Sequence, residues 1–110
     1  MDKKEYCGVF GIYDHNLAVD LTYLGLYSLQ HRGEESCGMA TFNGRKIQQL
    51  KGMGLVSEVF TKAKLKGLKG KNSIGHVRYS TTGSSIIKNA QPFVIRHNKL
   101  SLSIAHNGNL

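Results

Sequence analysis

Residues 7–13 read CGVFGIY, a cysteine followed by a short apolar run that two glycines interrupt. Val9, Phe10 and Ile12 cluster within this run, which predicts a buried β-strand. Glycine inside a strand is typical of a place where another part of the backbone approaches closely. Cys7 therefore begins the predicted strand, with six mostly polar residues ahead of it.

An amphipathic helix is predicted directly after this strand, over residues 17–31. Its leucines recur at spacings of three to five, and Gly33 follows as a stop signal. The predicted apolar face consists of Leu17, Leu21, Leu24 and Leu29. Arg32 would meet the negative end of the helix dipole, so we interpret it as a structural residue.

A β-hairpin is predicted next, because CGMATF and RKIQQL flank Asn43 and Gly44. This pair tolerates positive φ, which suits the two-residue turn of a hairpin. LVSEVF, at residues 55–60, predicts a short helix. Residues 62–71 then read as a lysine-rich connector.

Three further strands complete the predicted fold. SIGHVRY, at 73–79, predicts an interior strand that ends near Arg78, and QPFVI, at 91–95, predicts a short strand after a loop. LSLSIAH, at 100–106, alternates cleanly, so that Leu100, Leu102 and Ile104 share one face. Strands combined with at least one helix predict an α+β layered domain.

The composition is that of one globular domain. The chain has 110 residues, 40% of them hydrophobic, and no apolar run approaches the roughly 18 residues that a membrane helix needs. Residues 1–6 lack the apolar core of a secretory signal, so we expect a cytoplasmic protein without membrane contact. Cys7 and Cys37 are then expected to be thiols. The histidines and cysteines show no zinc-binding spacing, so no metal site is expected.

The net charge of +8 leaves a second interpretation open, in which the chain is a non-enzymatic basic binding module. Its densest basic stretch is residues 62–71. That stretch contains no aromatic residue for base stacking, and the chain shows no zinc-finger or RNP pattern. A solvated connector explains the same residues, so we expect no nucleic-acid partner.

Cys7 raises a chemical question, because a thiol is only a few per cent thiolate near neutral pH and needs a base to act as a nucleophile. Loss of residues 1–6 would give Cys7 an α-amine with a pKa of about 7.7–8.0, able to accept the proton of its own thiol. While Tyr6 remains attached, that nitrogen is an amide, so we expect the uncut chain to be an inactive precursor. A cysteine that merely packs as a small hydrophobe is the alternative.

Two later segments offer the other groups that a cysteine nucleophile requires. HVRYSTTG places Arg78 at a strand-to-loop junction, where its guanidinium could hold a carboxylate and a threonine hydroxyl could add a contact. HNGN offers the side-chain amide of Asn107 and the N–H of Gly108 as donors to an oxyanion. A surface arginine and an ordinary hairpin turn are the plain alternatives.

Four motifs in this order, CGVFGIY, SLQHRGEES, GHVRYSTTG and AHNGNL, closely resemble the glutamine amidotransferase domain of the amidophosphoribosyltransferases. The resemblance spans residues 7–110 and implies a four-layer αββα N-terminal nucleophile hydrolase fold, present here as its N-terminal part. It also implies that residues 1–6 are a propeptide. The implied site residues are Cys7 as the nucleophile, Arg78 and Thr81 as the glutamine-binding residues, and Asn107 with Gly108 as the oxyanion hole.

The resemblance implies a reaction in two halves. Cys7 attacks the side-chain amide of L-glutamine and releases ammonia, which a phosphoribosyltransferase domain of the same chain transfers to phosphoribosyl pyrophosphate. The product, 5-phosphoribosylamine, belongs to the first committed step of purine synthesis. The resemblance implies no cofactor within these residues and magnesium in the remainder of the enzyme, and it leaves open an iron–sulfur cluster there. A homo-oligomer is expected for the full-length enzyme.

Other enzymes of the same class, glucosamine-6-phosphate synthase and asparagine synthetase, also begin on a cysteine. The glucosamine enzyme typically has tryptophan where this chain has Tyr79, so the motifs favour the purine enzyme. The family's glutamine-binding aspartate would lie beyond Leu110. We therefore expect a truncated domain that hydrolyses glutamine poorly when it is isolated.

Overall fold

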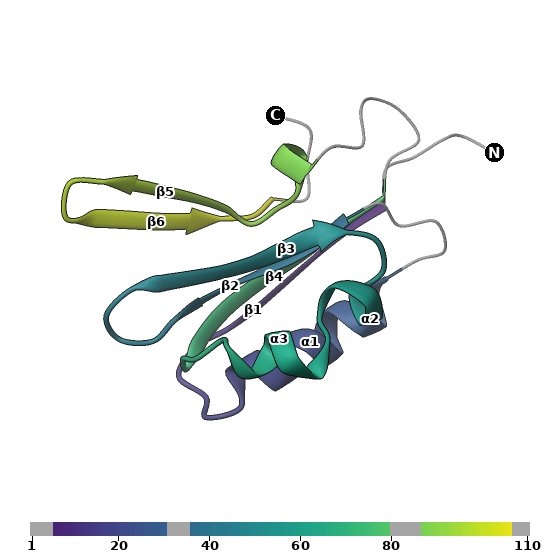
Figure 1. Cartoon of the computed structure of the whole chain (residues 1–110), viewed down its shortest axis with the longest axis horizontal. Coiled ribbons are helices and arrows are strands. Elements are labelled where there is room, and N and C mark those ends of the chain that lie inside the picture. The colour runs from purple at the N-terminus through teal and green to yellow at the C-terminus, as the bar shows by residue number, and fades with distance from the viewer. Residues whose placement is uncertain (1–5, 31–35, 80–86, 107–110) are drawn as a thin grey trace.

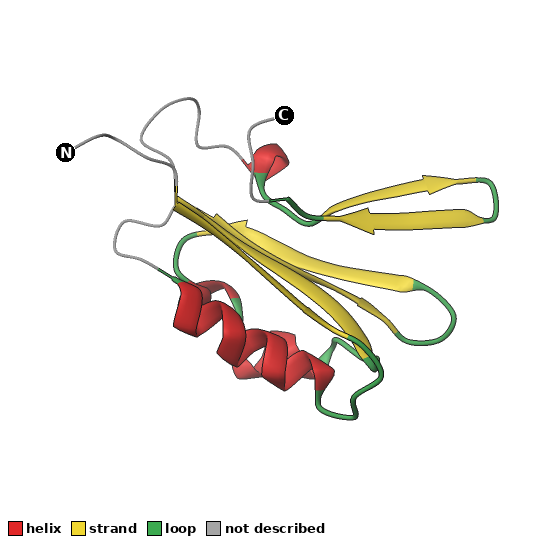
Figure 2. Ribbon diagram, turned by 180° about the vertical axis from the view of Figure 1, so that it is seen from behind, coloured by secondary structure: helices red, strands yellow, loops and turns green. Residues whose placement is uncertain are grey.

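The computed structural model describes residues 6–30, 36–79 and 87–106, which form three layers. Three helices cover one face of a four-stranded sheet, and a two-stranded hairpin lies over the opposite face (Figures 1 and 2). The helices are α1 (Ala18–Leu29), α2 (Val56–Val59) and α3 (Lys62–Lys66), and a 3-10 turn η1 (Ile87–Asn89) precedes the hairpin. The strands are β1 (Tyr6–Ile12), β2 (Ser36–Phe42), β3 (Ile47–Met53), β4 (Asn72–Tyr79), β5 (Phe93–His97) and β6 (Leu100–Ile104).

The four-stranded sheet has the order β1-β4-β2-β3, and each neighbouring pair is antiparallel. The strand that SIGHVRY predicts, β4, therefore lies inside the sheet, and the strand that begins near Cys7 is its edge. The predicted α+β layered arrangement is confirmed. The remaining hairpin pairs β5 with β6.

Helix α1 packs closely on the sheet, and its buried face matches the predicted one only in part, because Leu29 packs against the core as predicted. Its buried residues are Ala18, Thr22 and Leu26, whereas Leu17 and Leu24 are about half exposed. The prediction was wrong for Leu17 and Leu24 because it weighed leucines alone. A Cβ on Gly75 of β4 would lie 2.8 Å from both Leu26 and Thr22, so the glycine lets small and large helix residues approach the strand. The helix also ends at Leu29, earlier than the predicted stop; Arg32 and Gly33 lie outside the described residues.

The β2–β3 hairpin is confirmed, but its turn is longer than predicted. Phe42 pairs with Ile47, which leaves four loop residues. The Asn43 side chain accepts hydrogen bonds from the backbone N–H groups of Arg45 and Lys46, so it organises this loop. A two-residue turn does occur between β5 and β6, where Asn98 has a φ of 55°.

The lysine-rich connector is also more structured than predicted, because it contains helix α3. The Thr61 hydroxyl accepts a hydrogen bond from Lys64 N–H, as an N-cap residue does. Leu68, directly after the helix, is buried in the core beside Val56 and Phe60. The lysines of this helix lie on the outer surface, and this segment helps to close the core.

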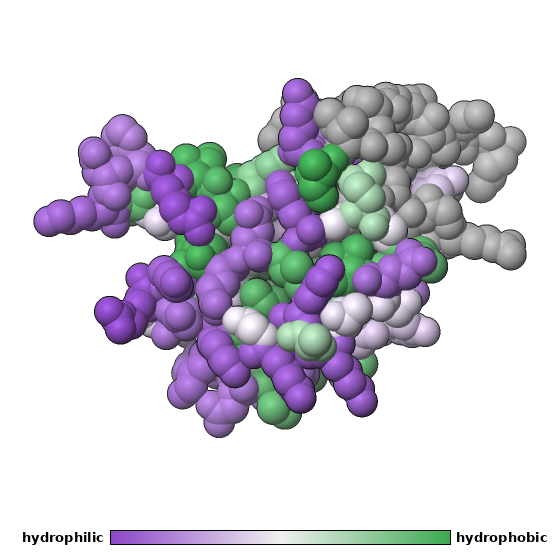
Figure 3. Space-filling view, in the orientation of Figure 1, coloured by the Kyte–Doolittle hydropathy of each residue, from purple (hydrophilic) through white to green (hydrophobic). Residues whose placement is uncertain are grey.

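The alternating strand predicted at 100–106 is confirmed as β6, and its apolar face is largely exposed. Leu100, Leu102 and Ile104 are 73%, 52% and 44% exposed, and Ile95 of β5 shares their face. Figure 3 shows apolar side chains gathered over this hairpin among hydrophilic ones. Within the described part of the chain, no helix is long and apolar enough to cross a membrane.

Candidate active site

Cys7 and Arg78 lie directly opposite each other in the sheet, because β1 pairs with β4 in the register Cys7↔Arg78. Side chains of directly paired residues project from the same face, with Cα atoms about 4.5–5.5 Å apart. Both residues are half-buried. The sheet thus brings together two residues that are 71 positions apart in the sequence and that were predicted to share one site.

These two side chains project from the face opposite the helices. A Cβ on Gly8, the next residue along β1, would lie 2.9 Å from Leu29 of α1, so position 8 faces the helix layer. Cys7 faces the other way, because successive residues of a strand alternate between faces. The hairpin and η1 lie over that face (Figure 1). Cys37 has the opposite orientation, since it pairs with Val77 and is fully buried in the core.

Arg78 sits near the end of β4, as predicted, between Cys7 on one side and Ser36 on the other. Its Nη1 donates a hydrogen bond to the Asn89 carbonyl oxygen at 3.3 Å. This contact ties the guanidinium to the turn η1. Ser36, which is buried, was not predicted, and its pairing with Arg78 could only be known once the register of β2 was fixed.

His76 is the second unpredicted residue of this face. It lies two residues before Arg78 on the same strand, so it shares that residue's face. Its Nε2 lies 2.9 Å from the carbonyl oxygen of His106. Burial lowers the pKa of His76 to about 4, so the imidazole is neutral near physiological pH. The two-residue period of β4 places His76 on the face of Arg78, but the sequence carries no local signal for its contact with His106.

The chain returns to this face after β6, as the sequence predicted. His106 makes the hydrogen bond to His76, and its ring lies 6.4 Å from that of Phe93. The remaining predicted site residues, Thr81, Asn107 and Gly108, lie outside the described residues. Asn107 and Gly108 follow His106 directly in the sequence.

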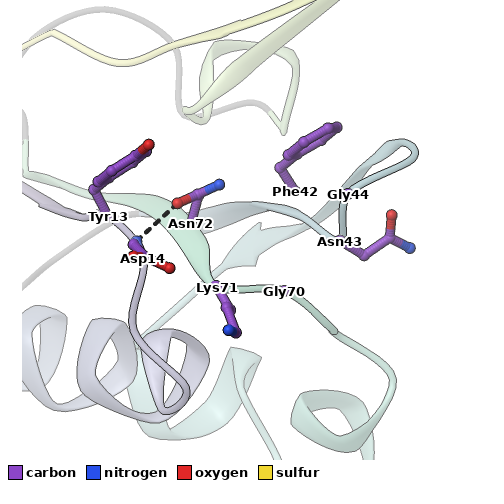
Figure 4. A pocket seen from close by; sticks show the side chains of 8 residues that line it. All are labelled: Tyr13, Asp14, Phe42, Asn43, Gly44, Gly70, Lys71 and Asn72. Carbon is purple, nitrogen blue, oxygen red and sulfur yellow. Dashed lines mark hydrogen bonds between the residues drawn. The ribbon is translucent and has the colours of Figure 1, made fainter.

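A separate hollow of about 300 Å³ lies at the far end of the sheet (Figure 4). It is lined by the residues that follow β1, by the end of β2 with the loop after it, and by residues 70–72 at the start of β4. There the N–H of Asp14 donates a hydrogen bond to Asn72 Oδ1 at 2.8 Å. Tyr13 at its rim is 84% exposed. Cys7 is six residues away along β1, or roughly 20 Å at the rise of a strand. This hollow is therefore distinct from the face that carries the cysteine.

The described residues of this face include no metal centre. Across residues 6–30, 36–79 and 87–106, no three histidine, cysteine or acidic side chains gather where they could hold a metal ion. The two cysteines form no disulfide. What the described face offers is a thiol, a guanidinium, a neutral imidazole and the backbone of His106.

The chain is similar in sequence to curated amidophosphoribosyltransferases. Amidophosphoribosyltransferase from Bacillus subtilis is 51% identical over 108 residues, which are 97% of this chain and 23% of that protein. The protein of the same name from Synechocystis is 56% identical over 108 residues, or 97% of this chain and 22% of that protein. The chain thus spans about a fifth of the length of these relatives.

A solved structure shows the same fold. The glutamine phosphoribosylpyrophosphate amidotransferase from B. subtilis, complexed with ADP and GMP, superposes with a TM-score of 0.82 at 50% identity, over 93% of this chain and 22% of that one. The fold class is therefore the N-terminal nucleophile hydrolase class that the motifs implied. Residues 7–110 match the family described as class-II glutamine amidotransferases. The chain belongs to that family, and the interpretation as a basic binding module is not supported.

Proposed function

We propose that this chain is the glutaminase part of an amidophosphoribosyltransferase. In this proposal residues 1–6 are a propeptide and residues 7–110 are the N-terminal portion of the glutaminase domain. The observation that carries it is the pairing of Cys7 with Arg78 on one face of the sheet, within a chain about half identical to amidophosphoribosyltransferases. A glutaminase needs a nucleophile and a carboxylate anchor within the length of one glutamine.

The nucleophile is Cys7, and its base is its own amino group once Tyr6 is removed. The bond to be cut joins Tyr6 to Cys7. In the sheet it lies between the Tyr6↔Tyr79 pair and the Cys7↔Arg78 pair. The freed amine, with a pKa of about 8, accepts the thiol proton as sulfur attacks the glutamine amide carbon. The amine then gives that proton to the departing nitrogen, which leaves as ammonia.

The other residues bind the substrate and stabilise charge. Arg78 binds the α-carboxylate of glutamine, and the Thr81 hydroxyl adds a hydrogen bond. The tetrahedral intermediate carries an oxyanion, which accepts hydrogen bonds from the Asn107 side chain and the Gly108 N–H. Collapse of this intermediate gives a γ-glutamyl thioester on Cys7, and water hydrolyses the thioester to glutamate.

The second half of the proposed reaction lies outside these residues. Ammonia passes to a phosphoribosyltransferase domain, which attaches it to phosphoribosyl pyrophosphate and forms 5-phosphoribosylamine. We assign magnesium to that domain, as the resemblance implies, because the glutaminase step proposed above needs no metal. An iron–sulfur cluster would likewise need ligands outside this chain.

The test compares one full-length protein before and after its amine is exposed. A fusion tag joined directly to Cys7, and cut by a protease that leaves Cys7 first, keeps everything else constant. We expect glutamine hydrolysis to rise at least about 100-fold on cutting, the usual contribution of a general base. Transfer of added ammonia, which bypasses Cys7, is the control and should not change. Equal glutaminase rates before and after cutting would contradict the proposal.

Two expectations from the sequence stay proposals, namely a cytoplasmic location and a homo-oligomeric full-length enzyme. Cell fractionation tests the first. Light scattering on the purified full-length enzyme tests the second, with a monomer as the contrary result.

A further inference from the structure

Both backbone groups of His106 are held by side chains from other parts of the chain. Its carbonyl oxygen lies 2.9 Å from His76 Nε2, and its N–H donates to Gln91 Oε1 at 2.7 Å. His76 is fully buried and Gln91 is 5% exposed. A residue held at both its donor and its acceptor cannot slide along the chain direction without breaking one of these bonds.

The backbone on either side of Gln91 is held by side chains of the sheet. Lys51 Nζ donates to the Ala90 carbonyl oxygen at 3.0 Å, and Gln49 Nε2 donates to the Pro92 carbonyl oxygen at 2.8 Å. Gly38 of β2 lies beneath, and a Cβ there would overlap the Gln91 carbonyl oxygen. The segment that carries Gln91 is therefore seated directly on the polar face.

His76 supplies the second fixed point. A carbonyl oxygen only accepts hydrogen bonds, so His76 Nε2 carries the proton and donates it. Because burial lowers the pKa of His76 to about 4, this neutral donor form persists at physiological pH. His76 pairs with Val9, two register positions along the sheet from the Cys7↔Arg78 pair. The contact thus links His106 to the strand that carries the substrate anchor.

We infer that His76 and Gln91 are positioning residues that fix His106 and thereby place the oxyanion donors of Asn107 and Gly108 relative to Cys7. This inference rests on the proposed function, which assigns those donors. Asn107 is joined to His106 by one peptide bond, so any shift of His106 is passed on to it. Catalytic groups must be held within about 0.5 Å of the productive geometry, which makes such a shift costly.

The test uses variants of the full-length enzyme. His76→Leu and Gln91→Met remove the donor and the acceptor, whereas His76→Gln keeps an N–H donor at similar reach. We expect kcat for glutamine hydrolysis to fall about 100-fold in H76L and Q91M, with the glutamine KM within about threefold of wild type. H76Q should recover most of the loss. Gln48→Met is the matched control, because Gln48 also bonds backbone groups, at Gly67 and Lys69, but on the helix side.

A second measurement separates positioning from folding. An aldehyde analogue of glutamine adds to the Cys7 thiol and places its oxygen in the oxyanion position, whereas iodoacetamide alkylates Cys7 without forming an oxyanion. We expect H76L and Q91M to bind the aldehyde about 100-fold more weakly and to be alkylated at the wild-type rate.

Several outcomes would overturn the inference: wild-type kcat and aldehyde affinity in H76L and Q91M, an H76Q loss as large as that of H76L, or parallel losses of aldehyde binding and alkylation. Failure of the proposed function looks different, because wild-type enzyme would then show no glutamine-dependent activity while still using added ammonia.

Discussion

The two faces of the four-stranded sheet are built from the same strands and hold their neighbours by different means. On the helix face, Val77 and Cys37 pack against α1 and α2 in an apolar core. On the hairpin face, polar side chains bind backbone carbonyl groups instead, as Lys51 binds that of Ala90 and Arg78 that of Asn89. Because strand residues alternate, β4 contributes to both faces at once. The apolar core and the proposed chemistry thus alternate residue by residue along one strand.

The largest effect should come from replacing the cysteine of the hairpin face, Cys7, and the same replacement at Cys37 on the helix face is the comparison. Cys7→Ala should lower glutamine-dependent activity at least about 1,000-fold, because no other group replaces the nucleophile. Urea unfolding of C7A should match wild type, and ammonia-dependent transfer should persist. Cys37→Ala should do the reverse, with activity kept and stability lowered by about 1 kcal/mol through a small core cavity. A catalytically competent C7A enzyme would refute the assignment of the faces.

A comparable contrast is expected between two glycines. Gly38→Ala should destabilise the protein by about 3 kcal/mol, because the new Cβ would overlap the Gln91 carbonyl oxygen, which is backbone. Gly75→Ala meets only the side-chain ends of Leu26 and Thr22, so about 1–2 kcal/mol is expected. Denaturant titration measures both. G38A should also lose glutaminase activity at temperatures where it is folded. If G38A and G75A lost the same stability and the same activity, the two faces would not differ in this way.

The pH dependence of stability should reveal the buried imidazole of the hairpin face. The pKa of His76 is about 4 in the folded protein, below its ordinary value of 6.5, so the unfolded chain binds more protons between these values. The stability contributed by neutral His76 is present above pH 6.5 and falls as pH drops towards 4, by about 3 kcal/mol in total. The free energy of unfolding, measured with urea at each pH across this range, should change less steeply with pH in H76Q than in wild type. The same pH dependence of stability in both proteins would show that a group other than His76 causes it.

The smallest effect on activity concerns the substrate anchor. Arg78→Lys keeps the charge but loses the planar fork that binds a carboxylate through two bonds. We expect the glutamine KM to rise about 30-fold, or about 2 kcal/mol, while kcat changes little. Arg96→Lys serves as the matched control, because the exposed Arg96 of β5 also donates to a backbone carbonyl, that of Ile47. A large fall in kcat with unchanged KM would give Arg78 a role other than binding.

Local patterns predicted most of the elements, because period and composition are properties of short segments. The apolar run after Cys7, the alternation from Leu100 and the turn signals around Asn43 each led to a strand or hairpin that the structure contains. The buried face of α1 could be predicted only in part in this way. It depends on which positions of the sheet are glycine, as at Gly75, and therefore on pairing between distant strands.

The candidate site was predicted only in part for the same reason. Cys7 and Arg78 were singled out by their chemistry, and the register then placed them together. His76 and Gln91 were missed because neither lies in a pattern that suggests a role until His106 is brought against them. Their contacts span 30 and 15 residues, which no local reading of the sequence can supply.

The separation of the two faces can be tested most directly by labelling the two cysteines in one sample. A diazo-ketone analogue of glutamine is incubated with processed full-length enzyme, and the modified residue is located by peptide mass spectrometry. Label should appear on Cys7, be suppressed by excess glutamine, and be absent from Cys37, which is buried on the helix face. Equal labelling of both cysteines, or labelling of Cys7 that glutamine does not suppress, would contradict the account.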